Sequence, residues 1–276
     1  MQNNHKGYIG VFDSGYGGLT ILKEFQKRLP QYDYIYLGDN ARAPYGTRSF
    51  EVVYQYTLEC VEFLFAQGCE IIILACNTAS AQALRTIQQK VLPIKYPGKK
   101  VLGVLRPSTE MVGELSKTKV VGVLATTGTV KSESYKIEIE KFTPGVKVVQ
   151  QACPLWVPII EANQHTTKEG EAIFKKDIDV FLEAHPKVDT IVLGCTHYPL
   201  IYNYLRSIIP AHIQLVTQGE IVAERLEDYL NRHTEISTRL NRGTTLQFYS
   251  SENSEDFKSY LKENDWGDQK VNHFTL

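Results

Sequence analysis

The chain of 276 residues carries 30 Lys and Arg against 31 Asp and Glu, a balance that excludes the basic composition typical of nucleic-acid-binding proteins. Its length allows one large domain or two modest ones, and no apolar run approaches the roughly 20 residues that a membrane-spanning helix needs. Met1–Gly7 is polar, unlike the apolar part of a secretory signal, and the five cysteines form no C-x-x-C pair, so we expect a cytoplasmic protein with reduced thiols.

The first predicted strand, Tyr8–Phe12, leads into the turn D-S-G-Y-G-G and a predicted helix. Its spacing is not G-x-G-x-x-G, and the carboxylate of Asp13 would repel a phosphate, so a nucleotide site is not favoured. Asp13 could instead receive an ammonium group or orient a nearby thiol. The alternative is that Asp13 and Ser14 cap the helix N-terminus. The backbone can turn sharply and approach a ligand at three glycines, Gly15, Gly17 and Gly18.

The second predicted strand, Tyr34–Leu37, is followed by a loop that continues to an amphipathic helix from about Ser49 to Ala66. This loop is rich in Gly, Pro and polar residues and follows the carboxyl end of a strand, so we expect it to form the wall of a site. Backbone N–H groups around Tyr45 and Gly46 could hold a carboxylate there. A solvated turn is the alternative interpretation.

The apolar run Ile71–Ala75 is rich in β-branched residues and predicts a strand buried on both faces of a parallel sheet. Cys76, Asn77 and Thr78 follow it at the start of a predicted helix. The free N–H groups and positive dipole end of a helix N-terminus favour a thiolate. The alternative is a buried cysteine that acts as a small hydrophobe. We interpret the remaining cysteines before residue 160 in that way, namely Cys60, Cys69 and Cys153.

A break at Pro93–Lys100 marks the predicted boundary between two halves of the chain. We expect strands at Val101–Leu105, at Val120–Ala125 and at Val146–Val149. The apolar segment after the last of these strands closes at Glu161. The ordinary role for Glu161 would be an exposed acid on a helix, paired with a histidine four residues later.

The segment Thr190–Leu200, T-I-V-L-G-C-T-H-Y-P-L, repeats the pattern around Cys76. Gly122 follows Gly10 by 112 residues, and Cys195 follows Cys76 by 119, which indicates two related halves. Each half would place a cysteine at the carboxyl end of a strand, where ligands bind in open α/β sheets. Two thiols on opposite sides of one cleft could remove a proton from one face of a carbon and return one to the other face.

We therefore predict an α/β fold of two pseudo-symmetric lobes, each a mostly parallel sheet flanked by helices, with the active site in the cleft between them. The segments that follow a predicted helix at about Ile221–Arg232 are too short to hold a core of their own, so they should pack on the first lobe. The predicted lobes are residues 1–99 plus 218–276, which carry Cys76, and residues 100–217, which carry Cys195.

Four blocks of the sequence resemble the signature blocks of the glutamate racemases, a cofactor-independent family of amino-acid racemases. The blocks are D-S-G-Y-G-G-L-T at 13–20, G-D-N-A-R-A-P-Y-G-T at 38–47, A-C-N-T-A-S-A at 75–81 and G-C-T-H-Y-P-L at 194–200. They stand in the family's order and spacing. The chain departs from the family at Asn40, where threonine is usual, and at Ala125, where glycine is usual. It also has T-Q-G-E at 217–220, near the expected lobe junction, where the family's motif generally begins with Asp.

The resemblance implies an enzyme that interconverts L- and D-glutamate with no pyridoxal phosphate or other cofactor. Cys76 would deprotonate D-glutamate and Cys195 would deprotonate L-glutamate, with Asp13 near the first cysteine and Glu161 and His197 near the second. It further implies a cytoplasmic homodimer that supplies D-glutamate for peptidoglycan, and we expect no metal. The implied substrate-binding residues are Asp13, Ser14, Tyr45, Gly46, Asn77, Thr78, Thr126, Thr196 and His197.

Three alternatives stay open. An aspartate racemase, or a racemase of broader specificity, would keep both cysteines and change the pocket around Tyr45 and Thr126. A solute-binding protein also has two lobes, although it usually carries an export signal. A zinc site could use Cys76, Cys195 and His197 as ligands.

Overall fold

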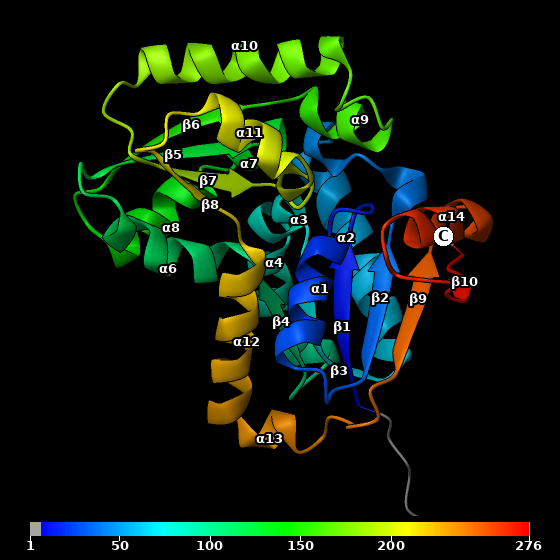
Figure 1. The fold of residues 1–276 in the computed structure, drawn as a ribbon. Helices are drawn as coiled ribbons and strands as arrows, with labels where there is room; N and C mark the ends of the chain where they lie inside the picture. Colours follow the sequence, from blue (N-terminus) through cyan, green and yellow to red (C-terminus); the bar gives the residue numbers. More distant parts are fainter. Residues whose placement is uncertain (1–6, 276) are drawn as a thin grey trace, which may run out of the picture.

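Residues 7–275 are described by the computed structural model (Figure 1). The polar stretch Met1–Gly7, which we expect not to be a secretory signal, therefore lies outside the described residues except for Gly7. The described chain forms two parallel sheets, one of six strands and one of four. This arrangement confirms the predicted α/β fold with two mostly parallel sheets.

The larger sheet is built from β1 (Tyr8–Asp13), β2 (Tyr34–Gly38), β3 (Cys69–Leu74), β4 (Lys100–Gly103), β9 (Leu246–Ser250) and β10 (Val271–His273). Their order is β10-β9-β2-β1-β3-β4. The smaller sheet is built from β5 (Val120–Ala125), β6 (Lys147–Ala152), β7 (Thr190–Gly194) and β8 (Gln214–Val216), in the order β6-β5-β7-β8. The order β2-β1-β3-β4 thus has the same pattern as β6-β5-β7-β8, as expected for two related halves.

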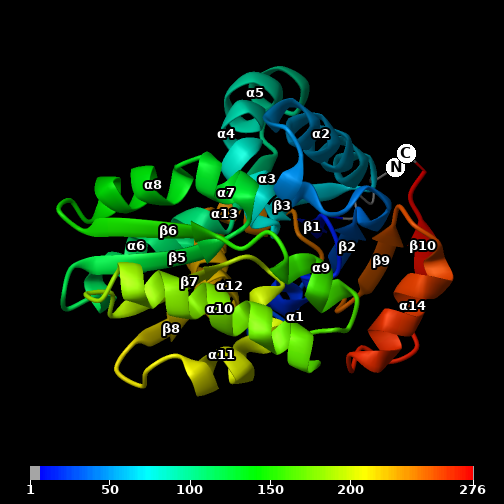
Figure 2. The same ribbon diagram turned by 90° about the horizontal axis from the view of Figure 1, so that it is seen from above.

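Helices connect these strands and cover both sheets (Figures 1 and 2). The longer helices are α1 (Leu19–Arg28), α2 (Phe50–Ala66), α6 (Leu105–Leu115), α8 (Ser134–Phe142), α10 (Lys168–Ala184), α11 (Tyr202–Ile208), α12 (Gly219–Arg232) and α14 (Ser254–Glu263). The shorter ones are α3 (Asn77–Gln82), α4 (Leu84–Thr86), α5 (Leu92–Lys95), α7 (Thr127–Lys131), α9 (Trp156–Glu161) and α13 (Thr234–Ser237). A π-helical turn covers Ile87–Val91, and 3₁₀ turns cover Asn40–Arg42, Tyr45–Thr47 and Tyr198–Ile201.

Side chains alternate between the two faces of each strand and so define three apolar cores. Val11 of β1 and Val192 of β7 belong to one core that is shared by both sheets and by α1, α6, α8 and α12. Phe12 faces a second core under α2 and α3, and Leu193 faces a third under α9, α10 and α11. The shared core joins the lobes by continuous apolar packing. In Figure 1 the carboxyl ends of both sets of strands consequently point toward the region around α3 and α9.

The strand expected to open the second lobe belongs instead to the first sheet. Lys100–Gly103 pairs with β3, with Val101 opposite Ile72, so the expected boundary between residues 99 and 100 is wrong for the sheets. The strand ends earlier than expected, because Leu105 already begins α6. The chain crosses to the second lobe through Val104 and α6 and returns through Gln218 into α12, which packs on α1. Of the last two strands, β9 pairs with β2 and β10 pairs with β9, so both belong to the larger sheet.

The repeated glycines at 10 and 122 have a packing explanation. A Cβ atom on Gly10 would lie 3.0 Å from Sγ of Cys69, and one on Gly122 would lie 2.6 Å from the ring of Phe181. Real Cβ atoms almost never have contacts as short as the second one. Glycine at these matching positions therefore lets a large or soft side chain pack directly on a central strand.

Candidate active site

One pocket lies where the carboxyl ends of the two sheets meet, and nearly all of the residues expected at a site line it. Of the expected residues, those that line it are Ser14, Tyr45, Gly46, Cys76, Asn77, Thr78, Thr126, Glu161, Cys195, Thr196 and His197. Asp13 is fully buried beside this wall. The empty volume of the pocket is about 520 Å³, including the part open to solvent. Both cysteines, one following a strand of each sheet, therefore line the same pocket.

The thiol of Cys76 sits at the start of α3. Its Sγ atom is 3.4 Å from Oγ of Ser14 and 3.5 Å from the backbone N of Ala79. The pKa of Cys76 is raised to about 12, chiefly by burial and also by the nearby Asp13 carboxylate, although the Ser14 and Ala79 contacts oppose the shift. The expected effect of the helix N-terminus is thus present but is outweighed by desolvation. Without substrate, Cys76 is a thiol at neutral pH.

Asp13 connects the two lobes. Its Oδ1 accepts a hydrogen bond from Oγ1 of Thr196 at 3.2 Å, and its Oδ2 accepts one from the backbone N of Gly15 at 3.0 Å. Burial raises the pKa of Asp13, while His197 and these hydrogen bonds oppose the shift. The alternative role as a helix cap is wrong for Asp13 and Ser14, because α1 begins after Gly18 and has no side-chain cap.

The glycines of the first turn serve close packing rather than a sharp backbone turn. A Cβ atom on Gly15 would lie 2.8 Å from Oε1 of Glu161, and one on Gly17 would lie 2.5 Å from Nδ1 of His197. Gly18 makes similar room for Asp13. None of the three has a positive φ. The space that we expected a ligand to fill is taken by side chains of the protein, mainly from the second lobe.

Cys195 contacts His197, which in turn contacts Glu161. Its Sγ atom is 3.9 Å from Nδ1 of His197, whose Nε2 is 2.9 Å from Oε1 of Glu161. Burial lowers the pKa of His197, but the contacts with Cys195 and Glu161 outweigh burial and raise the pKa well above 6.5. Glu161 pairs with this histidine and not with His165, so its role as an ordinary exposed helix acid is wrong.

Hydroxyl groups meet across the cleft. Oγ1 of Thr78, from the first lobe, is 2.9 Å from Oγ1 of Thr126, which in turn is 3.1 Å from Oγ1 of Thr129. A Cβ atom on Gly46 would lie 2.7 Å from Cβ of Thr126, so the loop around Tyr45 and Gly46 packs directly on the second lobe. These buried hydroxyls are donors and acceptors positioned at the pocket wall.

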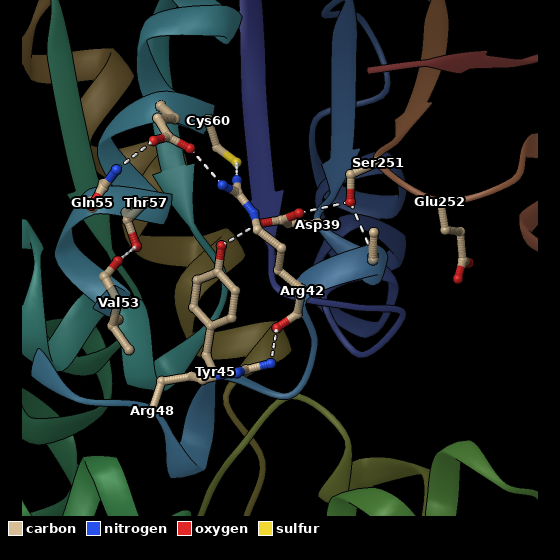
Figure 3. Close-up of polar contacts among 12 residues, drawn as sticks. Asp39, Arg42, Tyr45, Arg48, Val53, Gln55, Thr57, Cys60, Ser251 and Glu252 are labelled. Atoms are coloured by element: carbon tan, nitrogen blue, oxygen red, sulfur yellow. Dashed lines mark hydrogen bonds and ion pairs between the residues drawn. The ribbon is translucent and has the colours of Figure 1, made fainter. Parts of the chain in front are cut away.

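A buried carboxylate anchors that loop (Figure 3). Asp39 accepts hydrogen bonds from the hydroxyl of Tyr45, from Nε of Arg42 at 2.6 Å and from Oγ of Ser251 at 2.7 Å. Arg42 also pairs with Glu59. The phenol of Tyr45 is therefore held within the first lobe. Tyr45 therefore lines the pocket beside Gly46 but offers no free hydroxyl group to a ligand.

Sequence reasoning missed part of the lining. Cys153, which we interpreted as a core residue, is buried in the third core and also lines the pocket. It follows the carboxyl end of β6, and that position beside β5 is the signal that could have found it. The other missed residues that line the pocket are Pro44, Thr47, Thr127, Pro154, Val157 and Pro158.

Among residues 7–275, no group of three or more His, Cys, Asp and Glu side chains has an arrangement that could hold a metal ion. Across the same residues, no helix has both the length and the apolar character needed to cross a membrane.

The chain is similar in sequence to known amino-acid racemases. A family model described as Asp/Glu/Hydantoin racemase matches residues 19–226. A glutamate racemase of Ruegeria sp. is 40% identical over 245 residues, which cover 85% of this chain and 89% of the relative.

Solved structures are similar over nearly the whole chain. The glutamate racemase isoform RacE1 of Bacillus anthracis has a TM-score of 0.88 at 29% identity, covering 98% of both chains. A glutamate racemase of Francisella tularensis, solved with D-glutamate, has a TM-score of 0.84 at 30% identity and covers 99% of this chain and 98% of its own.

The Asp39 anchor predicts a stability effect. Asp39→Asn should destabilise the fold by about 3–5 kcal/mol, because it leaves the largely buried guanidinium of Arg42 without its buried carboxylate. Glu59→Gln is the matched control, because it removes the charge of the other partner of Arg42. The side chain of Glu59 is 42% exposed, so this substitution should cost at most about 1 kcal/mol. Urea unfolding measures both. Equal losses in the two variants would contradict the anchoring role.

The His197 contacts predict a pH effect. NMR titration of the imidazole should give a midpoint above 6.5, and Glu161→Gln should lower that midpoint. Because the folded-state pKa is raised, the stability that protonated His197 contributes is complete below pH 6.5 and is lost as the pH rises through the raised value. His197→Gln assigns the resonance. A midpoint at or below 6.5 in the folded protein would show that burial dominates instead.

Proposed function

The chain belongs to the Asp/Glu/hydantoin racemase family, and on that premise we propose that it interconverts L- and D-glutamate by proton transfer between two cysteines. The observation that carries the proposal is that Cys76 and Cys195 line one pocket and come from the matching strands β3 and β7 of two similar sheets. Two sulfur atoms that reach one pocket from different lobes suit a reaction that removes a proton from one face of Cα and delivers another to the opposite face.

The two cysteines have different surroundings, and this difference suggests which of them acts as base first. Cys76 is a thiol before substrate binds, because its pKa is raised to about 12. His197, whose pKa is raised well above 6.5, lies beside Cys195 with its Nδ1 3.9 Å from the sulfur. With L-glutamate bound, the Cys195 sulfur would take the Cα proton, and the Cys76 thiol would give its proton to the opposite face. The reverse direction starts from the opposite protonation state.

The polar wall suits a substrate with two carboxylates and an ammonium group. Hydroxyls of Ser14, Thr78 and Thr126 can donate to carboxylate oxygens, and Asp13, which is hydrogen-bonded to the lining residue Thr196, would attract the ammonium. An ammonium between Asp13 and Cys76 would also offset the effect of that carboxylate, which raises the pKa of the thiol. Fixed dipoles of these buried polar groups would stabilise the charge that develops as Cα loses its proton.

The wider role follows from the same family. We propose that no pyridoxal phosphate takes part, because two thiols supply both the base and the acid that the reaction needs. We also propose a cytoplasmic homodimer whose D-glutamate is used in peptidoglycan synthesis. The relatives and solved structures named as glutamate racemases, including the one crystallised with D-glutamate, support glutamate as the substrate.

The two-base assignment predicts a labelling result. Either enantiomer of glutamate, incubated in deuterated water with no added cofactor, should yield the opposite enantiomer with deuterium at Cα. Cys76→Ala and Cys195→Ala should each lower the rate of racemisation by about 10²- to 10⁴-fold or more, because each removes one acid–base group.

Cys69→Ala is the control for those variants, since this buried cysteine lies in the second core and outside the pocket. It should keep the wild-type rate per folded molecule. Full turnover by either pocket variant would contradict the two-cysteine mechanism, while wild-type turnover that depends on added pyridoxal phosphate would contradict the proposed chemistry.

Substrate choice separates this proposal from an aspartate racemase. We expect kcat/KM for L-glutamate to exceed that for L-aspartate at least about 10-fold, since one missing methylene changes binding by about 1–3 kcal/mol. Initial rates of circular dichroism change with each amino acid measure the ratio. A ratio below one would assign the chain to aspartate instead.

A further inference from the structure

One buried amide connects both chain crossings between the lobes. Gln218 follows β8 and caps α12, where the chain returns to the first lobe, and its side chain is buried. Its Nε2 donates to the carbonyl oxygen of Val104 at 3.1 Å and lies 2.9 Å from Oγ of Ser108. Val104 is the residue at which the chain leaves the first sheet for α6. The side chain of Gln218 therefore links the two crossings directly.

The same amide reaches the residue next to Cys76. Oε1 of Gln218 accepts a hydrogen bond from Nδ2 of Asn77 at 2.8 Å. Asn77 directly follows Cys76, begins α3 and lines the pocket. Gln218 thus links the lobe junction to the first turn of the helix that positions Cys76.

A phenol from the second lobe closes a ring of three side chains. The hydroxyl of Tyr135, in α8, donates to Oδ1 of Asn77 at 2.8 Å and accepts from Nε2 of Gln218 at 3.1 Å. A Cβ atom on Gly194, which directly precedes Cys195, would lie 3.2 Å from the aromatic ring of Tyr135, so Tyr135 packs beside the strand end that carries the second cysteine. The ring of Asn77, Tyr135 and Gln218 therefore joins the start of α3, next to Cys76, to a side chain that packs on the end of β7.

We propose that Gln218 is a positioning residue for the racemase reaction, acting through Asn77 and Tyr135 to fix the Cys76 side of the pocket relative to the Cys195 side. This inference rests on the proposed function. Both sulfurs must reach one Cα atom, so a small shift of α3 against α8 impairs transfer in both directions. A misplacement of about 1 Å can cost about 100-fold in rate.

The experiment combines two substitutions in a double-mutant cycle. Gln218→Leu removes both polar ends at similar volume, and Tyr135→Phe removes only the shared hydroxyl. We expect each to lower kcat about 10-fold or more for both enantiomers, and the double variant to lose far less than the product of the two single losses, because both break the same ring. Ser108→Ala is the matched control: it removes a partner of the same Nε2 atom outside the ring and should keep kcat within about twofold.

The outcomes separate the possible roles. Three results would overturn the positioning role and leave a structural one. The first is a loss of kcat in the double variant that equals the product of the two single losses. The others are a wild-type kcat in folded Gln218→Leu and a loss of kcat in Ser108→Ala as large as that in Gln218→Leu. If Gln218→Leu does not fold, Tyr135→Phe decides, since it leaves the contact between Gln218 and Asn77 in place: a wild-type kcat overturns the proposal and a 10-fold loss supports it. Failure of the wild type to racemise glutamate would instead refute the proposed function, and with it this inference.

Discussion

The pocket owes its position to apolar packing between the inner faces of two sheets. Val11 in β1 and Val192 in β7 belong to one continuous core, together with side chains of α1, α6, α8 and α12. Because side chains alternate along each strand, the register that buries these residues also fixes which residues stand at the strand ends. Cys76 follows β3 and Cys195 follows β7, so the packing that joins the lobes also brings the sulfurs to one pocket.

Burial has different electrostatic outcomes in the two halves of the site. Desolvation raises the pKa of Cys76 to about 12 and raises that of Asp13, so the first half of the site favours neutral forms. In the second half, contacts with Cys195 and Glu161 outweigh the desolvation of His197 and favour its charged form. Two halves with similar strand order thus differ in charge state, and the difference comes from the side chains around each sulfur.

Much of this arrangement could be predicted from sequence, because it is encoded locally. The run Ile71–Ala75 before Cys76 and the matching run before Cys195 predict buried strands that end in a thiol, and the four sequence blocks predict the family. The strand predicted at Val101–Leu105 is expected in the second lobe, but residues 100–103 pair with β3 of the first sheet. Sequence could not show this, because a short strand carries no local sign of its hydrogen-bond partner.

The rest depends on contacts between distant segments. The glycines at 15 and 17 look like ligand-binding turns in sequence, but the groups beside them are Glu161 and His197 of the other lobe. The ionisation of Cys76 depends on how deeply the folded protein buries it. The hydrogen bond from the Tyr45 hydroxyl to Asp39 likewise could not be predicted from the sequence and is seen only in the folded structure.

The placement of β9 and β10 in the larger sheet has a consequence for synthesis on the ribosome. β2 pairs with β9 and β9 with β10, so the first sheet cannot be completed until residues 246–250 and 271–273 have left the exit tunnel. The second sheet, by contrast, uses a continuous segment that ends at Val216. Since chains emerge from the N-terminus and domains generally fold as units, the half of the protein that is translated later is the first whose strands are all available. The N-terminal half must wait, with the edge of β2 uncovered, for the last strands of the chain to arrive.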